Sequence, residues 1–149
     1  MNVNTEEEID KFNNWIMEMD DRLEPLLEYA EDHGYTLDYS LDSLAIFEDF
    51  VKHEKINFDH DYFITCACYL GEVVRINFNG QWDLDIDDPR SLYYRKPVIS
   101  KYSKYDTLFS PINILKNYTR EYKQGLLLRA IKATTDPEPF NLDKYPTED

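Results

Sequence analysis

A long stripe of apolar residues near the N-terminus constrains the fold of this chain most strongly. Its members recur at intervals of three and four residues: Ile9, Phe12, Ile16, Met19, Leu23, Leu26 and Ala30. This spacing predicts amphipathic helix, because residues three and four apart share one face of an α-helix. Pro25 leaves the stripe in phase, so either one long helix kinks there or Pro25 opens a second helix after a turn at residues 20–21. Gly34 is expected to end the run.

Two shorter apolar patterns predict further helices. One follows Ser40 or Asp42, since either side chain can cap a helix N-terminus. The other begins at Pro111, with Ser110 as its cap, because proline is well suited to the first position of a helix. Its apolar face continues beyond Gly125, so this last helix is expected to run on past the glycine.

Residues 61–79 fit two structures. Runs of aromatic and β-branched residues, Tyr62-Phe63-Ile64 and Val73-Val74, favour a strand by propensity. Helical spacing of the apolar residues favours a buried helix instead. The length of the segment, which contains no turn residue except Gly71, favours the helix.

A clean alternation of residue types follows this segment. Trp82, Leu84 and Ile86 would face one side of a strand, and Asp83, Asp85 and Asp87 the other. Residues 93–102 form a second strand candidate that is expected to pair with the first, with Pro97 confining it to an edge or splitting it. A short extended piece is also expected at residues 36–39.

These patterns predict an α+β fold of about four to five helices packed with a small antiparallel β-hairpin or sheet. The chain has 149 residues, of which 42% are hydrophobic and 15% aromatic, enough for one self-sufficient core. We expect a single domain over residues 1–133. Residues 134–149 contain three prolines and no periodicity, and are expected to be a mostly disordered tail.

Charge is unevenly distributed along the chain. Residues 1–89 hold 23 acids and 5 bases, whereas residues 90–149 hold 7 acids and 11 bases, for a net charge of −14. Such a charge disfavours nucleic acid and anionic membranes as partners and favours a basic protein. No apolar run is long enough to span a membrane, and the N-terminus lacks the features of a signal peptide, so a cytoplasmic location is expected.

No residue pattern predicts a catalytic centre, a cofactor site or a metal site. A calcium loop counted from Asp83 would require glycine and glutamate where Asp88 and Tyr94 stand. Cys66 and Cys68 lack further ligands for zinc and are expected to be small buried side chains. With only four glycines in the chain, a phosphate-binding loop of backbone amides is not expected either.

Three consecutive residues, Asp59, His60 and Asp61, are the alternative candidate for a metal-dependent enzyme. They lack a recognised ligand spacing, so capping of the next helix by Asp59 or Asp61 is the favoured interpretation.

A basic segment rich in tyrosine lies in the second half of the chain. Its members are Arg90, Tyr93, Tyr94, Arg95, Lys96, Lys101, Tyr102, Lys104 and Tyr105. Such a mixture can bind single-stranded nucleic acid, but the net charge of the chain argues against that partner. The segment is instead expected to lie against the acidic N-terminal helices or to mediate self-association.

Three short motifs resemble those of a group of uncharacterised bacterial domains. They are Leu37-Asp38-Tyr39-Ser40 with Ser43-Leu44, then Tyr69-Leu70-Gly71-Glu72-Val73, and finally Gly80 with Trp82. The resemblance spans roughly residues 36–115 and implies a bacterial source, a helix over residues 61–79, and structural roles for Tyr69, Gly71, Glu72, Gly80 and Trp82. It implies no activity, and it does not fix the residues around the cysteines. If Glu72 is buried, a raised pKa or a pairing with Arg75 is expected.

The function that fits these features is non-enzymatic binding of a basic protein, as an immunity or antitoxin protein would do. The binding surface is expected at Asp83, Asp85 and Asp87 with Tyr93 and Tyr94, or at the acidic face of the first helices. The rival interpretations are a homo-oligomeric structural or housekeeping protein, for which a homodimer would be the simplest form, and the metal-dependent enzyme described above.

Overall fold

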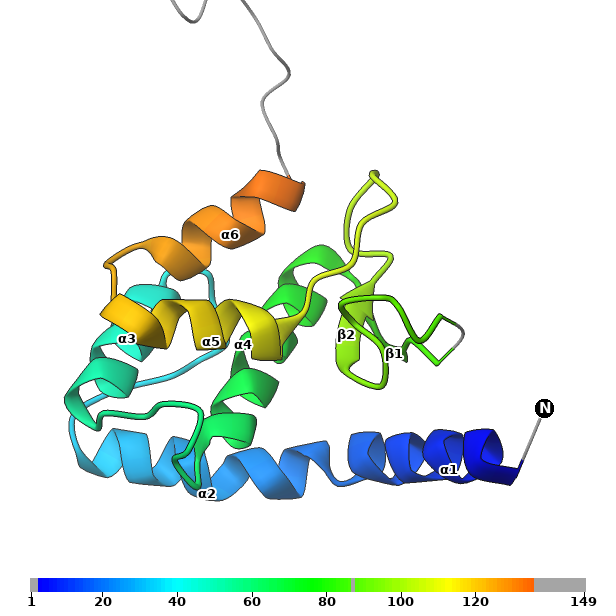
Figure 1. Ribbon diagram of the computed structural model, residues 1–149. Helices are drawn as coiled ribbons and strands as arrows, with labels where there is room; N and C mark the ends of the chain where they lie inside the picture. The colour runs from blue at the N-terminus through cyan, green and yellow to red at the C-terminus, as the bar shows by residue number, and fades with distance from the viewer. Residues whose placement is uncertain (1–2, 87, 136–149) are drawn as a thin grey trace, which may run out of the picture.

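The computed structural model describes residues 3–86 and 88–135 and confirms the α+β class (Figure 1). This part of the chain contains six helices, one more than expected, and a two-stranded antiparallel sheet. In chain order the elements are α1 (Val3–Met17), α2 (Met19–Asp32), α3 (Ser43–His53), α4 (Phe63–Phe78), β1 (Gln81–Leu84), β2 (Pro97–Ser100), α5 (Pro111–Glu121) and α6 (Leu126–Thr135).

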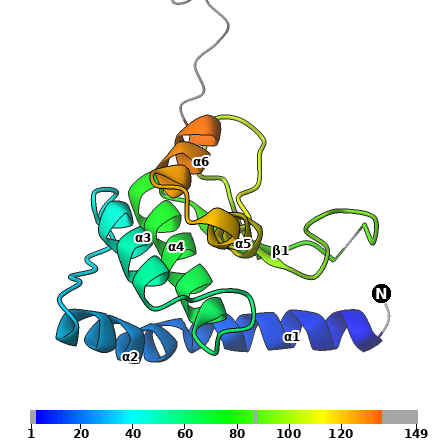
Figure 2. The same cartoon turned by 60° about the vertical axis from the view of Figure 1, so that its left-hand side comes forward.

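The apolar stripe forms two successive helices, α1 and α2, which lie along one side of the molecule (Figures 1 and 2). The break falls at Glu18, so the predicted kink at Pro25 or turn at residues 20–21 is wrong. Pro25 lies inside α2 on its exposed side, where its ring meets solvent and not the core. The helical hydrogen-bond pattern continues across the break, because the amide of Glu18 donates to the carbonyl of Asn14 (3.1 Å) and the amide of Arg22 donates to the carbonyl of Glu18 (2.9 Å).

The two helices contribute unequally to the core. Four members of the stripe on α2 are buried: Met19, Leu23, Leu26 and Ala30. On α1, by contrast, no side chain from residue 5 to residue 17 is fully buried. Gly34 ends α2 as predicted, with a φ of +92° and its amide bonded to the carbonyl of Glu31.

α4 is the central helix, which confirms the helical interpretation of residues 61–79. It packs against α2, α5 and both strands. Every residue from Cys66 to Val74 is buried, so the helix has neighbours on all sides over two and a half turns. A helix that is apolar all round shows little amphipathic contrast, which explains why its sequence also fits a strand.

The sheet consists of β1 and β2, paired from Gln81 with Ser100 to Leu84 with Pro97. The predicted pairing is thus correct, and Pro97 stands at the first position of its strand, where a missing amide is tolerated. Residues 36–39 are not extended strand: Tyr39 has a φ of 66°, and its amide donates to the hydroxyl of Tyr69 at 3.0 Å. The Tyr69 hydroxyl thus accepts the hydrogen bond that a backbone carbonyl of a neighbouring strand would accept from Tyr39 in a sheet.

The last predicted helix is two helices. Ser110 caps α5 by accepting a hydrogen bond from the amide of Asn113, as expected. The chain then turns at Tyr122 (φ 53°) and Gly125 (φ 85°) before α6 begins. α6 runs to Thr135, two residues beyond the expected domain boundary, and the remainder of the predicted tail, residues 136–149, lies outside the described residues.

A buried carboxylate explains the break between α5 and α6. Glu48 of α3 is only 2% exposed, and its two oxygens accept hydrogen bonds from the amides of Gly125 (2.7 Å) and Leu127 (3.0 Å). These amides belong to the start of α6, where a helix leaves its N–H groups without intrahelical partners. Glu48 therefore caps a helix that lies more than seventy residues further along the chain.

Candidate partner-binding surface beside helix α2

The motif residues meet around α4. The hydroxyl of Tyr69 is buried and shares a hydrogen bond of 2.7 Å with the hydroxyl of Ser43, in addition to accepting from the amide of Tyr39. The ring of Tyr39 stacks on that of Tyr69 with centroids 5.0 Å apart. The segment before α3 is thereby attached to the middle of α4, which gives the first two motifs a structural role.

The third motif attaches β1 to the same helix. A Cβ added at Gly71 would overlap the indole ring of Trp82, and one added at Gly80 would contact Ile99 and Tyr102 at 2.7–2.8 Å. Both glycines are therefore places where another element comes close to the backbone.

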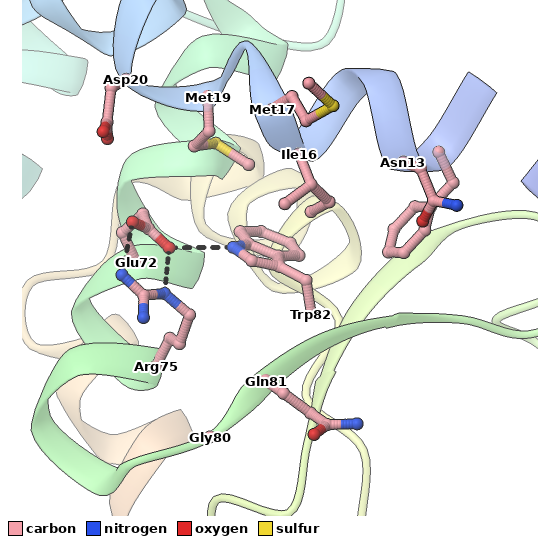
Figure 3. Close-up of a pocket in the computed structure, with 11 residues that line it drawn as sticks. Asn13, Ile16, Met17, Met19, Asp20, Glu72, Arg75, Gly80, Gln81 and Trp82 are labelled. Carbon is pink, nitrogen blue, oxygen red and sulfur yellow. Dashed lines mark hydrogen bonds and ion pairs between the residues drawn. The ribbon is translucent and has the colours of Figure 1, made fainter. Parts of the chain in front are cut away.

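Glu72 completes this contact as a buried hydrogen-bond acceptor (Figure 3). It receives two hydrogen bonds from Arg75, at 2.6 and 2.9 Å, and one from the indole nitrogen of Trp82 at 2.9 Å. The pairing with Arg75 that the sequence suggested is present, and it raises the pKa of the Arg75 guanidinium. Since both oxygens are bonded, Glu72 presents no free carboxylate to the adjoining cavity.

Asp83 in β1 and Asp85 just after it make hydrogen bonds to neighbouring residues and to the chain around β2. Asp83 accepts hydrogen bonds from the amide of Leu84 (2.9 Å) and the hydroxyl of Ser100 (3.2 Å), and the backbone carbonyl of Asp85 accepts from the amide of Arg95 at 2.7 Å. Asp87 lies outside the described residues. The first of the two predicted binding surfaces thus has one carboxylate already bonded within the sheet.

The two tyrosines of that surface belong to the turn between the strands. Tyr93 and Tyr94 are both half-buried, the amide of Tyr93 bonds to the hydroxyl of Ser91, and the ring of Tyr94 lies 5.3 Å from the guanidinium of Arg95. Partner binding at these residues remains a prediction.

The residues of the alternative metal site do not form a cluster. Within residues 3–86 and 88–135, no group of three or more His, Cys, Asp or Glu side chains is placed to hold a metal ion. His60 instead accepts a hydrogen bond at 3.0 Å from the amide of Tyr62, just before α4. The expected capping of α4 by Asp59 or Asp61 is therefore wrong, because Tyr62 stands at the N-cap position and no side chain caps this helix end.

The cysteines are buried and not joined in a disulfide, as expected for small core side chains. Burial raises the pKa of both thiols, that of Cys68 to about 12. Neither is therefore present as thiolate at neutral pH, the form that acts as nucleophile or metal ligand.

A row of carboxylates lines a hollow of about 370 Å³ beside α2. Asp20, Glu24, Glu28 and Glu31 follow one another at intervals of four, four and three residues and therefore lie on one face of the helix. Thr36, Leu37 and Tyr39, from the segment that follows α2, also line the hollow. In the described part of the chain, no basic side chain forms an ion pair with any of these four acids. We refer to these four residues as the acidic row.

A larger cavity of about 590 Å³ adjoins the acidic row, because Asp20 lines both (Figure 3). It lies between the end of α1, the start of α2 and the start of β1. Its lining combines apolar and polar side chains: Phe12, Asn13, Ile16, Met17, Met19, Asp20, Glu72, Arg75, Gln81 and Trp82, with Gly80. Met17 is 80% exposed, which is unusual for a large apolar side chain next to other apolar groups.

The basic residues of the second half of the chain are divided between the loops around β2 and the helices α5 and α6. α5 and α6 are separated from α2 by α4 in both views of the ribbon (Figures 1 and 2). The expectation that residues 90–105 lie against the acidic N-terminal helices is met only at Arg95 and Pro97, and among the described residues no ion pair joins the two regions. The nearest approach is a hollow next to α1 that Glu8 and Arg95 line together.

Comparison of the chain with protein-family models, with curated proteins and with solved structures found no match. Among the described residues, no helix combines the length and the apolar character that crossing a membrane requires. Fold and surface together therefore define a small α+β domain with an acidic groove along one helix. The spacing of its four acids was visible in the sequence, but the hollow beside them depends on the packing of residues 36–39.

Proposed function

We propose that the protein is a non-enzymatic binding protein that holds a basic protein partner at the acidic row of α2, in the manner of an immunity or antitoxin protein. The observation that carries the proposal is that Asp20, Glu24, Glu28 and Glu31 line one hollow and that none of them forms an ion pair among the described residues. A cationic surface placed there would supply the missing counter-charges.

The arrangement is unfavourable for the isolated protein. Like charges three or four residues apart on a helix destabilise it by about 0.2–0.5 kcal/mol per pair. Glu24 is involved in two such pairs within the row, with Asp20 and with Glu28. Binding of lysine or arginine side chains would convert this repulsion into attraction, and would also raise the association rate through steering by the negative field.

The spread of the row indicates the size of the partner. Eleven residues separate Asp20 from Glu31, which corresponds to about 16 Å along the helix axis. A single metal ion contacts ligands within about 2.6 Å and cannot bridge such a row. An extended basic surface of a protein can.

The test begins with affinity purification from the native lysate, followed by titration of the identified partner at low and high salt. We expect a basic partner whose Kd rises steeply with ionic strength and which binds the variant Asp20→Asn, Glu24→Gln, Glu28→Gln and Glu31→Gln at least tenfold more weakly. The control removes four exposed negative charges elsewhere through Glu6→Gln, Glu7→Gln, Asp59→Asn and Asp61→Asn, and should bind like the native protein. Equal affinity of both variants, or binding insensitive to salt, would refute the proposal.

The separation of charge also supports a second candidate, a homo-oligomeric structural protein. Residues 3–32 carry eleven acids and two bases, whereas residues 90–135 carry two acids and ten bases. Two copies could associate head to tail through these regions. Light scattering at low and high salt tests this idea: a concentration-dependent oligomer at low salt supports it, and a monomer under both conditions removes it.

A further inference from the structure

We infer that the part of the partner held by this protein is a basic amphipathic helix, with lysine or arginine side chains against the acidic row and one apolar side chain in the cavity beside Met17. This inference rests on the proposed function and goes further, because it specifies the secondary structure of the partner and a second point of attachment.

The cavity has the properties of an anchoring site. Its volume of about 590 Å³ lies within the range of about 300–1,000 Å³ typical of ligand pockets. Phe12 and Ile16 of α1 are only half-buried, and Met17 is largely exposed, so apolar surface remains available. Methionine side chains adapt readily to the shape of an incoming apolar group.

The buried carboxylate of Glu72 does not oppose an apolar anchor in the cavity. Glu72 is 5% exposed, and its oxygens are bonded to Arg75 and Trp82. The ring of Trp82 and the side chain of Met19 therefore form part of the cavity wall without an unsatisfied carboxylate between them (Figure 3). An apolar side chain that enters beside Trp82 and Met19 would therefore cover Glu72 without leaving its charge unpaired.

The spacing within the acidic row, and the position of the cavity at its end, match the spacing of side chains on one face of a partner helix. The acidic row repeats every three to four residues, about 5–6 Å, which is also the repeat of side chains on one face of a partner helix. The cavity begins at Asp20, the first member of the row, and extends toward Met17. A partner helix of about four turns that lies along α2 would thus place basic side chains on the row and an apolar one beyond its end.

Charge favours such a helix over a second copy of this chain. The protein has a net charge of −14, so two copies repel each other at long range even though one region of each is basic. A short basic helix has no such repulsion. An anionic ligand is disfavoured by the same four carboxylates that attract a cationic one.

The inference can be tested with designed peptides and the fluorescence of the protein. The probe is a helical peptide of about fourteen residues, ~21 Å long, with lysines at every third or fourth position and a leucine one turn beyond them. One control peptide replaces that leucine by serine, and a second has the same composition in scrambled order. Trp82 lines the cavity and Trp15 contacts it edge-on, so the emission of the two tryptophans in the chain reports occupancy.

We expect the probe to bind with salt dependence and to change the tryptophan emission. Replacing its leucine by serine, or introducing Met17→Ser in the protein, should weaken binding about tenfold, as loss of an anchor does. Leu92→Ser is the matched control, because Leu92 is 78% exposed and lies on the loop between the strands, outside the cavity lining. It should leave the Kd unchanged.

The other outcomes separate this inference from the proposed function. If the probe and the scrambled peptide bind equally, with no change in emission, the helix and its anchor are refuted, while salt-dependent binding lost in the acidic-row variant would still support a basic partner. If no basic peptide binds and the partner's affinity is unchanged by the acidic-row variant, the proposed function itself fails. A dimer of the protein that excludes the probe from the cavity would also overturn the inference.

Discussion

The indole nitrogen of Trp82 donates a hydrogen bond of 2.9 Å to the buried carboxylate of Glu72. This bond connects the first strand to the central helix at the point where Gly71 lets the indole ring approach the backbone. Both residues also line the cavity beside α1. The same contact therefore supports the fold and shapes the surface to which we assign partner binding.

Replacing Trp82 by phenylalanine should destabilise the protein by about 2–3 kcal/mol. The change removes a hydrogen bond to a charged acceptor, which is worth about 1.5–3 kcal/mol, and part of the ring that packs on Gly71. Denaturant unfolding monitored by circular dichroism measures the loss. Trp15→Phe is the control, because Trp15 contacts Trp82 only edge-on and should lose less.

Gly71→Ala should cost about 1–3 kcal/mol, because the new methyl group overlaps the outer ring atoms of Trp82. Phenylalanine at position 82 lacks these atoms. In a Trp82→Phe background, the same Gly71→Ala change should therefore cost clearly less, and the double-mutant cycle measures that coupling. Additive effects of the two substitutions would contradict the contact.

Glu48→Gln should lower the free energy of unfolding by about 1–3 kcal/mol. The charged carboxylate accepts two backbone hydrogen bonds at the start of α6, and the amide that replaces it has one acceptor and no charge. Hydrogen exchange should show the greatest loss of protection in α6. The neighbouring change Asp49→Asn serves as control, since Asp49 is exposed and should have an effect within about 0.5 kcal/mol.

Stability should fall at alkaline pH in two steps. Burial raises the pKa of Cys68 from 9.0 to about 12 and that of Tyr39 from 10.0 to about 12. Because the folded state binds these protons more tightly, their contribution is complete below the unfolded pKa and is lost as pH rises toward the folded one. The free energy of unfolding should therefore decline from about pH 9 upward.

The contributions of the cysteine thiols and of Tyr39 to the pH dependence of stability can be separated by substitution. In the variant Cys66→Ala, Cys68→Ala, the decline should begin about one pH unit later, where Tyr39 starts to contribute. Thermal unfolding followed across this pH range provides the measurement. An unchanged onset in the double variant would mean that the thiols do not contribute.

Glu24→Gln should stabilise the isolated protein by about 0.4–1 kcal/mol at low salt, because it removes repulsion with both Asp20 and Glu28. The gain should shrink as salt screens these charges. A melting temperature that does not rise would show that the row carries no electrostatic strain.

Helix positions were predictable from the sequence to the extent that one face of each helix is apolar. The stripe on α2 and the Ser110 cap of α5 follow from local patterns, whereas the break after Tyr122 depends on Glu48, an acid that contacts it only in the folded chain. The break at Glu18 has no local marker, since proline, the usual signal, stands seven residues later on the exposed side of α2. A long-range contact thus sets the boundary between α5 and α6.

The candidate site, like the helix boundaries, could be predicted from the sequence only in part. An acidic face on the first helices was one of two surfaces that charge alone suggested. Its spacing of three to four residues is a local property, but the hollow beside it is also lined by Tyr39, whose ring stacks on Tyr69 of the distant helix α4. On the other surface, at β1, the Asp83 carboxylate accepts a hydrogen bond from Ser100, a contact between strands that the sequence alone does not reveal.

The helices α2 and α6 lie on opposite sides of α4, and the segments that contain them carry opposite net charges (Figures 1 and 2). Residues 3–32 have a net charge of −9 and residues 90–135 one of +8, so a field from another molecule exerts a torque on this one before contact. A basic partner that approaches by diffusion would therefore meet the protein already rotated with α2 toward it. The order of charges along the chain thus shortens the orientational search that limits most protein associations.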